Sequence, residues 1–257
     1  MTVGTFGVLV LAGIGGGLTG SIAGLASLIS YPALLATGVP PVTANVTNTV
    51  ALVLNSVGSV SASGPELQGQ RRRLLPLGIA AMLGGALGAV LLLLTPPGAF
   101  ERLVPVLIAG ASAAILVQRP PRELAAEGAA EHAKHHDRDP RWLPAGVFAI
   151  GIYGGYFGAA AGVLMLAMFL LTTGEGVPRS NALKNVVLGL ANSVAALGYI
   201  VFSSVAWASA LPLAIGLFTG GSLGPRIVRV VPQTALRRVI AVAGLGLAVV
   251  LGVQAYR

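Results

Sequence analysis

Long apolar runs separated by short polar segments divide this chain into helices of membrane-spanning length. A helix needs about 20 apolar residues to cross a bilayer, and six segments meet or approach that length. They are 43–62, 74–94, 102–118, 181–203, 207–224 and 235–254. Two longer apolar stretches, 3–37 and 143–173, have glycine-rich centres and fit either one long helix or two short ones. The pattern predicts an all-α integral membrane protein with eight to ten spans.

The two ambiguous stretches carry the same motif. The glycine-rich segment 13–24 returns 138 residues later as 151–162, with seven of twelve positions identical. Further along, Asn48 and Asn55 match Asn185 and Asn192 at a spacing of 137. A duplicated half whose apolar segments are broken by glycine is typical of secondary transporters. We therefore expect an N-terminal transmembrane repeat at 1–117, a linker at 118–142 and a C-terminal repeat at 143–257.

The distribution of Lys and Arg favours five spans in each half. If each glycine-rich stretch crosses once, nine basic residues face one side and seven face the other. If each crosses twice, fourteen share one side and two face the other, which matches the cytoplasmic excess of basic residues. An odd number of spans inverts the second repeat relative to the first. The interpretation places both termini outside a bacterial inner membrane and the 118–142 linker in the cytoplasm.

Composition narrows the function. Only 9% of the residues are charged and 55% are hydrophobic, whereas soluble domains carry about 25% charge. The net charge of +8 sits in short loops, where it sets topology, so no nucleic-acid partner is expected. The absence of Cys excludes disulfides and thiolate metal sites. The glycine runs lack the Gly-Lys-Ser/Thr of a nucleotide-binding loop, and no cofactor is predicted.

The linker holds the histidines of the chain. His132, His135 and His136 could bind a metal as clustered imidazoles. No second ligand cluster exists elsewhere in the sequence to close such a site. We therefore expect no metal, and a solvated connection between the halves.

Ionisable side chains are scarce within the spans. All eight acidic residues lie in loops or at span edges, which argues against a carboxylate-lined cation pump. Proton coupling stays open, although the sequence shows no carrier for it. Lys184 lies in the first turns of the 181–203 span with no carboxylate within a helical turn. It either attracts an anion near the helix N-terminus or extends to the membrane interface.

Uncharged polar residues and glycines form the remaining candidate site. We expect Asn48 and Asn185 to line a cavity, and Asn55 and Asn192 to do so or to join helices to one another. Backbone amides at the helix breaks would also face the substrate. The candidate substrate-binding residues are Asn45, Thr47, Asn48, Asn181, Lys184 and Asn185, and the candidate helix-break residues are Gly24, Ser27, Pro32, Gly158 and Gly162.

Several of these motifs together resemble the sulfite exporter TauE/SafE family of membrane permeases. They are Pro-Ala-Leu-Leu-Ala-Thr-Gly-Val-Pro-Pro at 32–41, Ala-Asn-Val-Thr-Asn at 44–48 and Asn-Ala-Leu-Lys-Asn-Val at 181–186. The resemblance implies a multi-pass transporter of sulfur-containing anions such as sulfite or organosulfonates, commonly outward. The family often has a dense glycine run before the proline, where this chain reads Ala-Gly-Leu-Ala-Ser at 23–27.

The leading hypothesis is an anion transporter that works by alternating access between two inverted repeats. The alternatives are a passive anion channel and a transporter of a different small organic anion. A membrane-embedded enzyme is disfavoured because it would need a nucleophile, an acid–base pair or metal ligands facing one cavity. A scaffold protein would not need paired asparagine faces. The oligomeric state is left open by the sequence.

Overall fold

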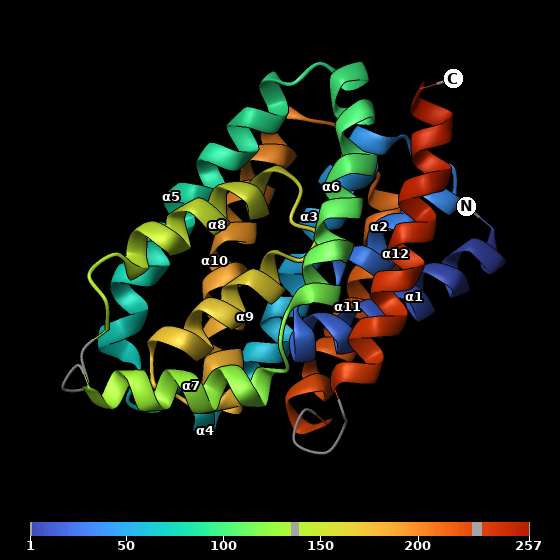
Figure 1. Cartoon of the computed structure of the whole chain (residues 1–257). Helices are drawn as coiled ribbons and strands as arrows, with labels where there is room; N and C mark the ends of the chain where they lie inside the picture. Colours follow the sequence, from blue (N-terminus) through green and yellow to red (C-terminus); the bar gives the residue numbers. More distant parts are fainter. Residues whose placement is uncertain (1, 135–138, 228–232, 257) are drawn as a thin grey trace.

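The computed structural model describes residues 2–134, 139–227 and 233–256, and this part of the chain is helical without strands (Figure 1). Proline at the first or second position begins α3, α6, α8 and α10, where its missing N–H leaves no helical hydrogen bond unmade. The helices of the N-terminal half and linker are α1 (Val3–Ala23), α2 (Ser27–Ala36), α3 (Pro41–Ser61), α4 (Gly64–Leu67), α5 (Arg71–Leu94), α6 (Pro97–Val117) and α7 (Pro121–Lys134). Those of the C-terminal half are α8 (Leu143–Tyr156), α9 (Ala161–Thr172), α10 (Val177–Phe202), α11 (Trp207–Ile227) and α12 (Gln233–Tyr256).

The all-helical membrane fold predicted from the sequence is confirmed. Each of the six predicted spans falls on one helix, and each glycine-rich stretch forms two helices, α1 with α2 and α8 with α9. Among the described residues, α1, α5, α6 and α10 are long and apolar enough to cross a membrane, and α2, α8 and α9 are shorter apolar helices. The inverted relation of the halves and the number of crossings stay predictions.

The first helix of each half packs against a helix of the other half. α1 lies along α11, and α8 lies along α5. Glycines let the backbones meet: a Cβ on Gly13 would lie 2.9 Å from Gly216 Cα, and one on Gly155 would lie 3.0 Å from Gly85 Cα. Such close approach through small residues is a main source of helix–helix attraction in membranes. The two halves are therefore interlocked rather than stacked as separate bundles.

Of the remaining contacts between the halves, α3 with α11 and α5 with α10 join non-equivalent helices, and two others join equivalent helices. α3 packs against α10, and α6 packs against α12 side by side (Figure 1). Large apolar side chains point outward from α5, α6 and α11, among them Leu94, Val106 and Leu211, each at least 59% exposed. An apolar exterior of this extent suits a lipid environment. The polar side chains buried inside must then satisfy one another, which directs attention to the interior.

The linker departs from the expected solvated connection because it contains the helix α7. This helix runs along the lower edge of the molecule in Figure 1 and packs against α9. Leu124 is 4% exposed and joins Leu166 and Leu170 in a small apolar cluster, which explains why the segment is ordered against the protein. His135 and His136 lie outside the described residues, and the described residues contain no cluster of metal ligands.

Candidate functional site

Two breaks in the helices create the candidate site. α1 ends at Gly24, whose φ of 78° is left-handed and whose N–H returns to the carbonyl of Gly20, a helix ending that glycine adopts with little strain. α8 ends before Gly158, whose φ is 74°, and α9 follows after Ala160 at a φ of 59°. The chain therefore turns sharply at 24–26 and at 157–160. Each turn presents a helix carboxyl end and the amino end of the next helix.

The two breaks touch each other. A Cβ on Gly24 would lie 2.5 Å from Gly162 Cα, and one on Gly162 would lie 2.5 Å from Gly24 Cα. These distances leave no room for a side chain on either residue, because the neighbouring atoms are backbone. The motif found twice in the sequence is thus brought together in space at its last glycine.

The carboxyl end of α1 is capped by side chains from α10, in the other half of the chain. Asn181 Nδ2 donates to the Ser21 carbonyl at 2.6 Å, and Lys184 Nζ donates to the Gly20 carbonyl at 2.9 Å. Asn185 Nδ2 reaches the Ser21 carbonyl at 3.4 Å. The last carbonyls of a helix have no partner within it and carry partial negative charge. The buried ammonium group therefore stabilises the end of α1.

The carboxyl end of α8 is capped by one side chain from the opposite half and by two from its own half. Asn45 of α3 donates through Nδ2 to the Tyr156 carbonyl at 2.9 Å. From the same half, the hydroxyl of Tyr199 donates to the Gly155 carbonyl, and the hydroxyl of Tyr153 donates to the Ala159 carbonyl. Each break thus has at least one cap from the third helix of the opposite half, so movement of one half shifts a cap of the other.

A small cavity lies where the breaks meet. Its volume is about 50 Å³, enough for about three to five water molecules at roughly 10–15 Å³ each. No acidic or basic side chain is among the described residues that line it. The lining residues are Gly20, Gly24, Ala26, Ser27, Thr49, Leu52, Asn55, Ser56, Gly154, Phe157, Gly158, Ala161, Gly162, Asn185, Leu188 and Asn192.

Two helix amino ends reach this cavity beside the carboxyl ends of α1 and α8. Ser27 is the first residue of α2, and Ala161 and Gly162 are the first two of α9, so the amino ends of two helices reach the cavity. Helix amino ends carry partial positive charge and free N–H groups, which bind anions. Three asparagines, Asn55, Asn185 and Asn192, add amide groups. The arrangement can hold a small polar anion without a full positive charge in the wall.

An aromatic contact borders the cavity. Phe157 lines it and meets the ring of Tyr31 edge to face at a centroid distance of 5.4 Å. Phe100 packs against the same phenylalanine at 6.0 Å. Phe157 and Tyr31 are 3% and 2% exposed, so this apolar cluster separates the cavity from the surface on that side.

The structure brings five of the eleven predicted site residues to the cavity. Gly24, Ser27, Gly158, Gly162 and Asn185 line it. The others are committed to contacts between helices: Asn48 bonds to Ser30 at 2.5 Å and to Ser27 at 3.2 Å, and Thr47 accepts from the Ala206 N–H at 3.0 Å. Asn45, Asn181 and Lys184 cap helix ends, as described above.

Pro32 is not a break, contrary to the expectation. It lies inside α2 (Ser27–Ala36), and the chain turns earlier, at Gly24. The proline lacks the N–H that would bond to the carbonyl of Leu28, but its fixed φ is compatible with a helix. The left-handed glycine sets the position of the turn, and the proline is accommodated after it.

The two asparagines for which the sequence left the role open, Asn55 and Asn192, lie in the cavity wall. The signal that could have found them is their repeat spacing, because each lies two helical turns beyond Asn48 or Asn185 on the same face. Asn55 Oδ1 is buried without a hydrogen bond in the described part of the chain. Unsatisfied buried oxygens are rare and often mark a ligand or water position.

These features define a class: a multi-pass helical membrane protein with a small polar cavity between broken helices, as in membrane transporters. The sequence model of the family described as Sulfite exporter TauE/SafE matches residues 9–251. The chain therefore belongs to the TauE/SafE family, as the sequence motifs predicted.

Relatives of known name agree with this class. The chain is similar to the probable membrane transporter protein ORF9 of Sinorhizobium sp, at 24% identity over 94% of this chain and 90% of the relative. It is also similar to the probable membrane transporter protein YfcA of Escherichia coli strain K12, at 26% identity over 92% and 85%. A probable membrane transporter protein of Haemophilus influenzae is 26% identical over 91% and 89%. No solved structure matches the chain.

Proposed function

We propose that this transporter moves a small oxyanion, sulfur-containing in the first instance, through the cavity between the two helix breaks. The observation that carries the proposal is the cavity itself. The amino ends of α2 and α9 meet amide side chains there, and none of the described lining residues is charged. Its volume of about 50 Å³ suits an ion of a few heavy atoms such as sulfite. A larger organosulfonate would require the breaks to separate.

The polar groups of the wall fit a singly protonated oxyanion. Such an ion accepts hydrogen bonds through its bare oxygens and donates one through its hydroxyl. Asn185, Asn192 and the helix amino ends supply donors, and the hydroxyl oxygen of Ser56 supplies an acceptor. In this proposal Lys184 positions the site by holding the end of α1 and does not itself touch the anion.

The caps from the opposite half support alternating access. The breaks touch at Gly24 and Gly162, and each is held by side chains of the opposite half. Rocking of one half against the other would separate the glycines on one side of the cavity and keep them together on the other. The Phe157–Tyr31 contact would open in one of the two states.

The test is flux of labelled sulfite in proteoliposomes, with and without an imposed pH gradient. We expect saturable flux that falls at least tenfold in Asn192→Ala, because a hydrogen bond to a charged group contributes about 1.5–3 kcal/mol. Ser222→Ala is the control, since Ser222 lies on α11 and bonds only to carbonyls of its own helix. Absence of sulfite flux in the wild type would exclude sulfite as the substrate, and sulfonates and carboxylates would be tested next.

A passive channel is the second candidate, and the same assay separates the two. A carrier shows saturation and accelerated exchange when substrate is present on both sides, whereas flux through a channel rises with concentration and shows no such exchange. Conductance steps in a planar bilayer would contradict the alternating-access proposal.

The proposed orientation places the termini outside and α7 in the cytoplasm. The chain has no native Cys, so a single introduced thiol reports one position. Ala126→Cys on α7 should react with a membrane-impermeant maleimide only after the cells are opened. Labelling of intact cells would reverse the orientation.

A further inference from the structure

A second, larger cavity lies at the end of the bundle on which α4 lies. Its volume is about 460 Å³, within the range of pockets for organic ligands. It is formed by the first turns of α5, α8 and α10 together with residues 139–141. Three helix amino ends thus converge on it, each with partial positive charge.

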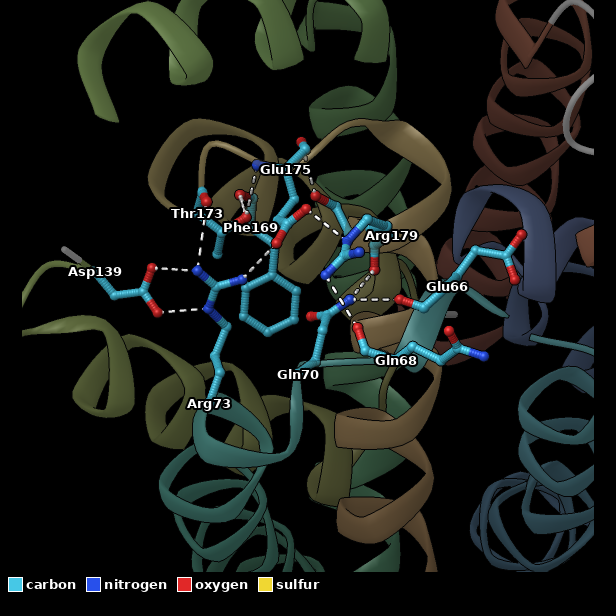
Figure 2. A network of polar contacts seen from close by, with 10 residues as sticks. Glu66, Gln68, Gln70, Arg73, Asp139, Phe169, Thr173, Glu175 and Arg179 are labelled. Carbon is cyan, nitrogen blue, oxygen red and sulfur yellow. Dashed lines mark hydrogen bonds and ion pairs between the residues drawn. The ribbon is translucent and has the colours of Figure 1, made fainter. Parts of the chain in front are cut away.

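An ion-pair network forms one side of this cavity (Figure 2). Arg73 donates to both oxygens of Asp139, at 2.6 and 2.9 Å, and to Glu175 at 3.1 Å. Arg179 pairs with the other oxygen of Glu175 at 2.7 Å. Two arginines and two carboxylates are therefore matched, and the network contributes no net charge.

Two further arginines leave the cavity positive. Arg72 and Arg141 line it, both are exposed, and neither has an ion-pair partner among the described residues. With the network balanced, the lining carries a net charge of +2, and the three helix amino ends add to it. The cavity is therefore complementary to an anion.

Apolar residues of the lining indicate what kind of anion the cavity would take. Pro76, Leu77, Leu143 and Pro144 line the cavity beside the arginines. Next to them Leu75 is 69% exposed on α5, and Trp142 is 55% exposed at the start of α8. Tryptophan concentrates at the membrane–water interface, and exposed leucine on an outward face belongs in lipid. The cavity mouth thus lies where headgroups and acyl chains meet.

We propose that this cavity binds the phosphate headgroup of an anionic phospholipid, with Arg72 and Arg141 on the phosphate and the apolar wall against the first acyl methylenes. Basic pockets between transmembrane helices are suited to such headgroups. The bound lipid would lie beside the Arg73 network and join the start of α5 to the start of α8. The proposal concerns a site separate from the transport cavity and does not depend on what is transported.

The test titrates the full-length protein in detergent with phosphatidylcholine or with phosphatidylglycerol. Trp207 is replaced by phenylalanine so that Trp142 is the single tryptophan, and binding is followed by quenching of Trp142 with a quencher next to the lipid headgroup. Each arginine near a lipid surface contributes about 1 kcal/mol, or about fivefold in affinity. We expect saturable phosphatidylglycerol binding that weakens about thirtyfold in the double variant Arg72→Gln, Arg141→Gln.

Controls make the outcome decisive. Arg71→Gln removes an exposed arginine on the same helix that does not line the cavity, and it should change binding less than twofold. Far-ultraviolet circular dichroism verifies that each variant keeps its helices. Equal binding of both lipids, or equal loss in Arg71→Gln, would overturn the site. Binding of inorganic phosphate as tight as that of the lipid would show a soluble-anion site and would overturn the lipid assignment.

Discussion

Replacing Gly162 by alanine tests whether the contact between the two helix breaks is needed. The new Cβ would lie 2.5 Å from Gly24 Cα and 2.9 Å from its carbonyl oxygen. Both atoms are backbone, so relief requires the breaks to move apart. Overpacking of this kind costs about 1–3 kcal/mol. We expect the melting temperature of the purified protein to fall by about 2–12 °C at about 2–4 °C per kcal/mol.

Gly24→Ala should be more harmful than Gly162→Ala. It meets the same backbone, with Gly162 Cα at 2.5 Å, and also places alanine at a φ of 78°. The left-handed conformation adds about 1–2 kcal/mol for a residue with a Cβ. The double variant should lose less than the sum of the two, because the first substitution already separates the breaks.

Gly15→Ala supplies the matched control. Gly15 lies in α1, and nothing comes within 4 Å of a Cβ built on it. Alanine in a helix interior is favoured over glycine by about 1 kcal/mol, so this variant should be as stable as the wild type or more so. Sulfite flux is measured on all four variants in proteoliposomes. Wild-type stability and flux in Gly162→Ala would refute the reasoning, because the contact would then be dispensable.

Three other substitutions test the surrounding contacts. Lys184→Gln removes the charge from the buried group at the end of α1 and should abolish flux while circular dichroism still reports helix; unchanged flux would show that this cap is not needed for transport. Asn48→Ala loses the bonds to Ser30 and Ser27. This should lower the free energy of unfolding by about 1–3 kcal/mol and so lower the melting temperature; an unchanged melting temperature would contradict the role of Asn48 in holding α2. Arg73→Gln breaks the pairs with Asp139 and Glu175 and should lower the free energy of unfolding by about 1.5–3 kcal/mol, measured as a fall in melting temperature. A fall no greater than in Arg71→Gln would show that the network does not stabilise the protein.

The helices were predictable because membrane spans are governed by one-dimensional patterns. Apolar length located the six spans, and the glycine repeat located the two breaks. The exact turn was less predictable: Gly24 was expected correctly, whereas Pro32 lies inside a helix. Both a proline and a glycine can mark the end of a helix. Which of the two does so depends on the path of the chain that follows, and the sequence does not show that path.

The candidate site was predictable as a region but not residue by residue. The repeat spacing grouped Asn48 with Asn55 and Asn185 with Asn192, and of these Asn55, Asn185 and Asn192 line the cavity. The spacing could not tell which asparagines line the cavity and which join helices, because that depends on how α2 packs against α3. Ser30 and Ser27 of α2 bond to Asn48, whereas Asn55 lines the cavity. For Lys184 the sequence left open a site role or a place at the membrane interface, whereas the structure buries it. Its acceptor is a helix end 164 residues away in the chain, which no local pattern reveals.

The glycine seam between α1 and α11 has a consequence for synthesis. Gly13 meets Gly216, and 203 residues separate them in the chain. At about 5–20 residues per second, α1 leaves the ribosome roughly 10–40 seconds before its partner exists. During that interval the glycine surface of α1 faces lipid or the insertion machinery. The glycine surface of α5 is likewise without its partner until α8 has been made. Neither half can complete its packing alone, so final assembly of the protein must wait until nearly the whole chain has been made.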